Sequence, residues 1–254
     1  MKRVAVLAII LFALAALLPF QYLRPVSPVA ATLLVPAKER VPGEAPTLMW
    51  PTRAAAAVSV VGLGSLGAHS DSTPRPMASV AKVMTALVVL DDHPLADLDP
   101  GPPIAIQPGD VQEYQANLAD GQSVVKVVEG EVLSEFQLLE GLLIPSGNNL
   151  AGVLARWDAG STDGFVARMN LKGIALGMKR THFADASGFS ERTVGTAGDL
   201  VLVGEALMAN PVLARIVGQG QADLPVIGTV FNVDYALGSE GIVGIKTGAA
   251  PRAG

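Results

Sequence analysis

Ser79 and Lys82 are the first residues whose types and spacing suit chemistry. Apolar residues recur at three- and four-residue intervals after Ser79, which predicts a buried helix over Ser79–Leu90. Residues three apart share one helical face, so the Lys82 amine can reach the Ser79 hydroxyl. Serine is a weak nucleophile until a base takes its proton, and a buried lysine can be that base if its pKa falls from about 10.4 to near neutrality. The pair predicts an activated nucleophile at a helix start, where backbone amides also favour an oxyanion.

Ser123 and Lys126 repeat the same spacing, so the spacing alone does not identify a site. The flanking valines predict a strand, in which residues three apart point to opposite faces. We therefore interpret Ser123 as a false match. For Ser79 taken alone, the alternative is an N-terminal helix cap followed by a solvated lysine.

A second short motif places Ser146 and Asn148 in a tight break between two predicted helices, just after Pro145. A hydroxyl and a carboxamide in such a break can project into a cleft. The alternative is an ordinary turn in which Asn148 caps the next helix.

A third motif, Lys246, Thr247 and Gly248, ends a Val/Ile-rich segment over Gly241–Gly248 that is predicted to be a strand. Lys246 would supply positive charge and Thr247 a hydrogen-bond donor, while Gly248 would let a substrate backbone approach closely. The alternative is an edge-strand lysine that discourages aggregation.

The elements that must position these motifs suggest an α+β fold in which strands flank a helical middle. Residues 54–63 and 66–72 are predicted strands, joined by a turn over Gly64–Gly67. Residues 100–131 are predicted to form loops and small hairpins. Ser134 and Gln137 form a predicted capping box that begins one helix. Thr196 and Asp199 form another, which begins a helix that extends to about Met208. Further helices are predicted over residues 149–157 and 161–176, and the first and last strands could share a sheet.

Composition narrows the function classes. The chain has 254 residues, of which 50% are hydrophobic and 16% charged, which is enough apolar material for a sizeable core. A net charge of −5 argues against a nucleic-acid partner. The absence of cysteine excludes disulfides, zinc–thiolate sites and a thiol nucleophile. The three histidines lack metal-ligand spacing, so we expect no metal and no other cofactor.

The N-terminus is predicted to be an export signal. Lys2 and Arg3 precede an apolar run from Val4 to Leu18, and small residues precede a cleavage point after Ala31. The alternative is an uncleaved membrane anchor, because about 20 apolar residues span a bilayer. We therefore divide the chain into a signal or anchor over 1–31, a proline-rich linker over 32–53 and a catalytic domain over 54–254.

The three motifs occur together and in this order in penicillin-binding proteins and class A β-lactamases. From about Arg75 to Gly254 the chain resembles the serine D-alanyl-D-alanine carboxypeptidases, which are low-molecular-weight penicillin-binding proteins. The resemblance implies a β-lactamase/transpeptidase-like fold with an antiparallel sheet packed against a helical region. It rests on the segments Arg75-Pro-Met-Ala-Ser79, Leu142-Leu-Ile-Pro-Ser-Gly-Asn148, Phe165-Val-Ala-Arg-Met-Asn170, Thr181-His-Phe183 and Ser187-Gly188.

By this resemblance, Ser79 is the acylated nucleophile and Lys82 its base. Ser146 and Asn148 would relay protons and hold the substrate. The terminal carboxylate of the substrate would bind Lys246 and Thr247, and the amides of Ser79 and Ala249 would form the oxyanion hole. The implied substrates are peptidoglycan stem peptides ending in D-Ala-D-Ala, with β-lactams as covalent inhibitors. The implied location is outside the cytoplasm, at the cell membrane, periplasm or wall.

A serine β-lactamase is the weaker enzymatic interpretation. Class A enzymes usually have Asp where Gly147 stands here, and they use a Glu followed four residues later by Asn to activate the deacylating water. None of the glutamates after Ser146, which are Glu191, Glu205 and Glu240, has Asn at that position.

The resemblance also implies further strands and a closing helix after the Lys246 segment, whereas only Ala249–Gly254 follow it. Six residues are too few for a turn and a typical strand. We therefore expect the chain to be part of a longer protein, with the last sheet strands missing. The non-enzymatic alternative is a truncated, inactive wall-associated or β-lactam-binding module.

Overall fold

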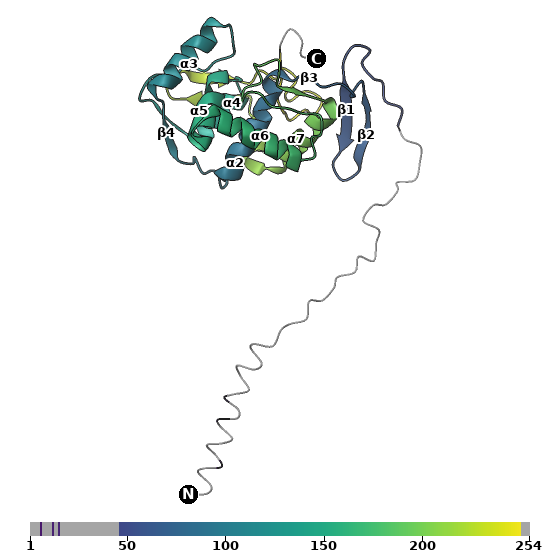
Figure 1. Ribbon diagram of the computed structural model, residues 1–254, viewed down its shortest axis with the longest axis horizontal. Helices are drawn as coiled ribbons and strands as arrows, with labels where there is room; N and C mark the ends of the chain where they lie inside the picture. Colours follow the sequence, from purple (N-terminus) through teal and green to yellow (C-terminus); the bar gives the residue numbers. More distant parts are fainter. Residues whose placement is uncertain (1–5, 7–11, 13–14, 16–45, 250–254) are drawn as a thin grey trace. The chain divides into compact units, whose positions relative to one another are not determined.

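The structure is a computed structural model that describes residues 46–249 together with residues 6, 12 and 15 (Figure 1). Apart from those three positions, the predicted leader over 1–31 lies outside the described residues, as does most of the proline-rich segment. In the described part, no single helix is long and apolar enough to cross a membrane. In that part, one pair of consecutive helices, α7 (Ala197–Ala209) and α8 (Pro211–Val217), is long and apolar enough when taken together, but the two axes are bent by 106°.

The helix that carries Lys82 lies among the other helices. The first turn is a 3₁₀ helix, η1 (Ala78–Ala81), and it continues as α2 (Lys82–Asp92). Every residue from Lys82 to Leu90 is buried, and α2 packs against several helices. The predicted helix over Ser79–Leu90 is confirmed. The packing partners are α4 (Glu135–Leu143), α5 (Asn148–Ala159), α6 (Thr162–Ala175) and α7.

The described strands form four separate antiparallel pairs. The first pair confirms the two strands predicted near the N-terminus, although the turn differs: it covers residues 61–63, where Gly62 has φ +85° and the Leu63 amide donates to the Val60 carbonyl (2.9 Å). Glycines 64 and 67 belong to the second strand instead. The pairs are β1 (Ala56–Val60) with β2 (Gly64–His69), β3 (Arg75–Pro76) with β6 (Val194–Gly195), β4 (Pro103–Ala105) with β5 (Val132–Ser134), and β7 (Gln221–Leu224) with β8 (Gly228–Phe231).

The strand predicted over Gly241–Gly248 is wrong for this structure. The segment has no strand pairing, and β1 pairs only with β2 among the described residues. Ile242 and Val243 are exposed, whereas Ile245 packs against the core. Val and Ile side chains fit the pleated surface of a sheet, so their presence favours a strand. A strand also needs a neighbouring strand with which its backbone can form hydrogen bonds.

The prediction of loops and hairpins over residues 100–131 missed a helix, α3 (Pro108–Ala119). Its polar sequence hides the period, because only Val111 and Tyr114 pack on the core. The start signals were present: a proline in the first turn, and a capping box in which the Gln107 amide donates to the Asp110 carboxylate (2.8 Å).

The other predicted helices are confirmed as α4 to α7. Ser134 forms the expected capping box with Gln137. Thr196 forms only half of one: its hydroxyl accepts from the Asp199 amide, but the Asp199 carboxylate instead accepts from the Arg180 amide and the Thr181 hydroxyl (2.8 Å each). The carboxylate therefore ties the start of α7 to residues 180–181.

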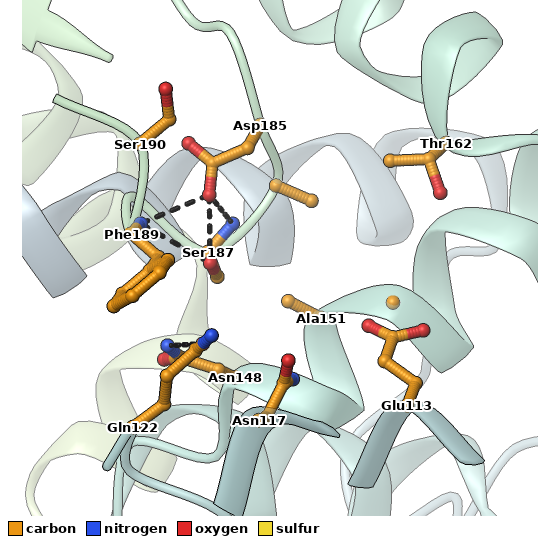
Figure 2. Close-up of a pocket in the computed structure, with 12 residues that line it drawn as sticks. Glu113, Asn117, Gln122, Asn148, Ala151, Thr162, Asp185, Ser187, Phe189 and Ser190 are labelled. Atoms are coloured by element: carbon orange, nitrogen blue, oxygen red, sulfur yellow. Dashed lines mark hydrogen bonds between the residues drawn. The ribbon is translucent and has the colours of Figure 1, made fainter. Parts of the chain in front are cut away.

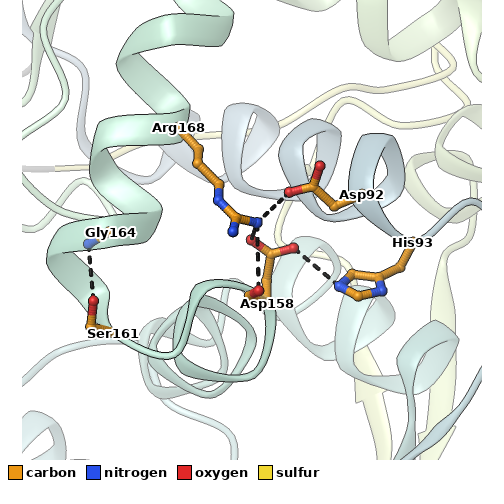
Figure 3. A network of polar contacts seen from close by, with 6 residues as sticks. All are labelled: Asp92, His93, Asp158, Ser161, Gly164 and Arg168. Carbon is orange, nitrogen blue, oxygen red and sulfur yellow. Dashed lines mark hydrogen bonds and ion pairs between the residues drawn. The ribbon is translucent and has the colours of Figure 1, made fainter.

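An ion-pair network fastens the far end of α2 to α5 and α6 (Figure 3). Arg168 on α6 donates to Asp92 (2.5 Å) and to the buried Asp158 on α5 (2.9 Å). His93 lies 3.2 Å from the other oxygen of Asp158. Three elements thereby meet at one buried carboxylate, which fixes the direction of the helix that carries Lys82.

Glu135, the first residue of α4, carries a buried carboxyl group. It has no exposed surface, and neither of its oxygens has a hydrogen-bond partner among the described residues. Burial, with added repulsion from Asp99 and Asp158, raises its pKa to about 7.

We expect Glu135→Gln to remove a pH dependence of stability. The folded-state pKa lies above the unfolded value of 4.5, so the wild type loses stability as pH rises from about 4.5 to 7. The free-energy advantage of the variant should grow across this window by about 3 kcal/mol. Urea unfolding of both proteins at pH 4, 5.5, 7 and 8 measures it. Parallel pH curves for the two proteins would contradict the assignment.

Candidate active site

Lys82 brings the predicted catalytic residues together. Its side chain is fully buried, and its amine nitrogen lies 2.8 Å from the Ser79 hydroxyl, 3.3 Å from the Ser146 hydroxyl and 2.6 Å from the Asn148 amide oxygen. A fourth neighbour is the carbonyl of Ser187, at 3.2 Å. The alternative of a solvated lysine beside a capping serine does not fit this arrangement.

The four neighbours of the Lys82 amine differ in what they can do. A neutral amine has two N–H groups and one lone pair. The Asn148 amide oxygen and the Ser187 carbonyl can only accept, so they take the N–H groups. The lone pair is left for a hydroxyl, and Ser79 is nearer than Ser146. The neutral amine is therefore arranged to accept the Ser79 proton.

Electrostatics favours the neutral form of this amine. Burial lowers the pKa of Lys82 well below its usual 10.5, and the positive charge of Lys246 lowers it further. The negative charge of Asp185 acts in the opposite direction. These are the conditions under which a lysine can serve as a general base.

The backbone beside Ser79 is shaped by close contacts. Ala78 has φ +48°, which is uncommon for a residue with a side chain. A Cβ built on Gly188, which has φ +79°, would lie 1.8 Å from the Ala78 carbonyl oxygen. One on Gly248 would lie 2.9 Å from the Met77 carbonyl oxygen. The close approach expected at Gly248 is therefore made by the chain's own backbone, next to Ser79.

We expect Gly188→Ala to slow acylation of Ser79 by about 10²-fold, because its methyl group would push the Ala78–Ser79 backbone out of place. Gly177→Ala is the matched control: it has nearly the same φ (+82°), but open space where its Cβ would be. Both variants carry backbone strain, and only the first displaces Ser79. Equal acylation rates with benzylpenicillin in the two variants would contradict this role of Gly188.

The Ser146–Asn148 break is not an ordinary turn. Ser146 has φ +68° and is buried, and Gly147, not Asn148, is the N-cap of α5. The Asn148 side chain spans the site: its oxygen faces Lys82 and its nitrogen donates to the Gln122 side chain (2.7 Å). Gln122 thus sets the orientation of the Asn148 amide, and nothing in the sequence singled it out.

Ser123 and Lys126 are both exposed, and no hydrogen bond joins their side chains in the described part of the chain. They lie on an extended segment whose buried residues alternate, at Val125 and Val127, although no strand forms. The expected separation of the two side chains is thus found without the strand that motivated it. The segment instead supports α5, since the Ser123 carbonyl accepts from the Asn148 amide (2.8 Å).

The third motif lies beside α2. Lys246 donates to the Thr247 carbonyl (3.0 Å), and burial lowers its pKa to about 8. It borders an apolar cavity of about 250 Å³ between α2 and α7. Thr247 is half-buried, while Gly248 and Ala249 are exposed. The carboxylate-binding and oxyanion roles of these residues stay predictions.

A cleft of about 230 Å³ opens beside Asn148 (Figure 2). One wall is the loop that carries Asp185, Ser187 and Phe189; Gln122 and the α3 side chains Asn117 and Glu113 lie opposite. Sequence reasoning missed the α3 wall because it missed α3.

Two further segments that support the family resemblance, residues 165–170 and 181–183, position this loop. Asn170 on α6 exchanges two hydrogen bonds with the backbone of Phe183 (2.8 and 3.0 Å). Phe165 and Met169 are fully buried on the same helix. Residues 165–170 and 181–183 therefore form one unit that holds the base of the loop.

Comparisons with known proteins find one family. The D-alanyl-D-alanine carboxypeptidase family matches residues 64–254. The D-alanyl-D-alanine carboxypeptidase DacB2 of Mycobacterium tuberculosis is 36% identical over 190 residues, which cover 72% of this chain and 61% of that protein. A D-alanyl-D-alanine endopeptidase of Pseudomonas aeruginosa is 36% identical over 140 residues, 55% of this chain and 42% of its own length. The chain thus spans less than two thirds of these relatives.

Two solved structures share the fold. A D-alanyl-D-alanine carboxypeptidase from Mycobacterium tuberculosis has a TM-score of 0.67 and 33% identity, covering 78% of this chain and 73% of that one. A Streptomyces DD-transpeptidase has a TM-score of 0.69 and 28% identity, covering 81% and 84%. The predicted α+β, transpeptidase-like fold class is confirmed. Since the family match extends over well more than half of the sequence, the chain belongs to the D-alanyl-D-alanine carboxypeptidase family.

Proposed function

We propose that this chain carries the catalytic site of a serine-type D-Ala-D-Ala carboxypeptidase. It would remove the terminal D-alanine of peptidoglycan stem peptides through an acyl-enzyme on Ser79. The observation that supports this most is the buried Lys82 amine, 2.8 Å from the Ser79 hydroxyl and within 3.3 Å of both Ser146 and Asn148.

The proposed steps begin with the Ser79–Lys82 pair. Lys82 accepts the Ser79 proton while the serine oxygen attacks the carbonyl carbon of the penultimate D-Ala. The oxyanion is stabilised by the amides of Ser79 and Ala249. When the peptide bond breaks, the departing D-Ala nitrogen takes the proton from Lys82 by way of Ser146. Water then hydrolyses the ester and regenerates Ser79.

Release of free D-alanine from a synthetic peptide ending in D-Ala-D-Ala tests the activity. We expect release from that peptide and none from a matched peptide ending in D-Ala-L-Ala. Benzylpenicillin should form a long-lived adduct. Rapid, repeated hydrolysis of the β-lactam would instead indicate a β-lactamase, and binding without acylation would indicate an inactive module.

We also propose that the protein works outside the cytoplasm, at the cell membrane, periplasm or wall. The support is in the sequence: Lys2 and Arg3 before an apolar run, then small residues up to Ala31.

We expect N-terminal sequencing of the protein from the exported fraction to begin at Thr32, because the small residues before it suit signal cleavage. A membrane-bound chain that retains Met1 would show that the segment is an anchor. Recovery of the full chain only from the cytosol would contradict export altogether.

A further inference from the structure

The loop over residues 184–193 is fastened to the catalytic helix at three points. The Ser187 carbonyl accepts from the Lys82 amine (3.2 Å). One residue earlier, the Ala186 carbonyl accepts from the Thr85 hydroxyl, one helical turn along α2 (2.6 Å). The third point is Gly188, which lies against the Ala78 carbonyl. The loop therefore contacts both the base and the backbone of the nucleophile.

Asp185 holds this loop in shape. One carboxylate oxygen accepts from the Ser187 amide (3.2 Å), the Ser187 hydroxyl (2.7 Å) and the Phe189 amide (3.0 Å). The other accepts from the hydroxyl of Thr193 (2.5 Å), which is fully buried. The Thr193 hydroxyl in turn accepts from the Ala184 and Asp185 amides (2.9 and 3.2 Å). Asp185 and Thr193 thus close the loop at its two ends.

This closure bears on the lone pair of Lys82. Without the Ser187 carbonyl, the neutral amine would have one fixed acceptor, Asn148, and its second N–H would turn toward a hydroxyl. With it, both N–H groups are occupied and the lone pair faces Ser79.

We propose that Asp185 is a positioning residue for acylation: it holds the 184–193 loop so that the Ser187 carbonyl occupies one N–H of Lys82 and directs the lone pair to Ser79. This inference rests on the proposed function of Ser79 and Lys82. The carboxylate also affects Lys82 through its charge. Among the described residues, the charged groups that act on Lys82 are Asp185 from this loop, which favours the ammonium, and Lys246 from the 241–249 segment, which disfavours it.

The test compares the full-length wild type with Asp185→Asn, Thr193→Val and Glu191→Gln. Asp185→Asn removes the charge and places an NH₂ group against the loop donors. Thr193→Val opens the closure but keeps the charge. Glu191→Gln is the matched control, because it neutralises an exposed carboxylate of the same loop. Two quantities are measured between pH 5 and 9: the second-order rate constant for acylation by benzylpenicillin, and the pKa of Lys82 by NMR of ¹³C-lysine, assigned with Lys82→Arg.

We expect Asp185→Asn to slow acylation by 10-fold or more and to lower the pKa of Lys82, because the carboxylate charge that favours the ammonium is removed. Thr193→Val should slow acylation by about 10-fold, and Glu191→Gln should match the wild type. Wild-type rates and an unchanged Lys82 pKa in Asp185→Asn would overturn the proposal. The proposal would also be overturned if the slower acylation of Asp185→Asn were accounted for by a lower melting temperature while the pKa of Lys82 stayed at its wild-type value. A wild type that penicillin does not acylate would contradict the proposed function instead, and the NMR titration would still decide on Asp185.

Discussion

Ser79→Ala is expected to abolish covalent labelling by fluorescent penicillin, because the variant lacks the oxygen that would carry the acyl group. The lysine beside it would stay buried against Ser146 and Asn148. The loss should be complete rather than partial, since among the described residues the Ser79 hydroxyl is the one nearest the Lys82 amine, at 2.8 Å against 3.3 Å for Ser146.

Ser123→Ala is the control for this experiment, because Ser123 has the same spacing to a lysine but an exposed position. It should label like the wild type at equal protein concentration. Labelling that survives in Ser79→Ala, or that disappears only in Ser123→Ala, would contradict the assignment of the nucleophile.

Lys82→Gln is expected to slow acylation by about 10³-fold, the usual scale for losing a general base. Glutamine keeps a neutral hydrogen-bonding side chain in the buried site but cannot take the Ser79 proton. Lys82→Arg should fail similarly, because a guanidinium stays protonated. Single-turnover acylation by benzylpenicillin measures both, with melting temperatures to show that each variant is folded.

The wild type should also show a pH dependence that these variants lack. Acylation needs neutral Lys82, so its rate should rise with pH through the pKa of that amine. Burial lowers this pKa, which places the rise well below pH 10.5. A Lys82→Gln variant that acylates at the wild-type rate, or a wild-type rate that begins to rise only near pH 10.5, would contradict the role of Lys82 as base.

The helical part of the fold was predictable because its signals are local. The capping box at Ser134 predicts the start of α4, and the helical spacing of apolar residues from Val80 to Leu90 predicts α2. The α3 helix was not predicted, because few of its side chains pack on the core and its sequence therefore lacks a clear apolar period. The Gly241–Gly248 segment failed for the opposite reason: its residues suit a strand, but pairing depends on a neighbouring strand that local sequence does not encode.

The site divides in the same way. The Ser79–Lys82 contact is local, because both residues share one helical face, so spacing predicted it. The contacts of Lys82 with Ser146 and Asn148 were predicted only through the family resemblance, because these residues lie 64 and 66 positions from Lys82 in the sequence. Gln122 and Asp185 act through a side-chain orientation and a loop shape, and neither has a signature in residue type or spacing.

Intact-mass spectrometry after exposure to benzylpenicillin, followed by peptide mapping, tests the central claim most directly. We predict one adduct per chain, located on Ser79. A folded chain that gains no mass, or an adduct that maps to another residue, would contradict the claim that Lys82 activates Ser79 as the nucleophile.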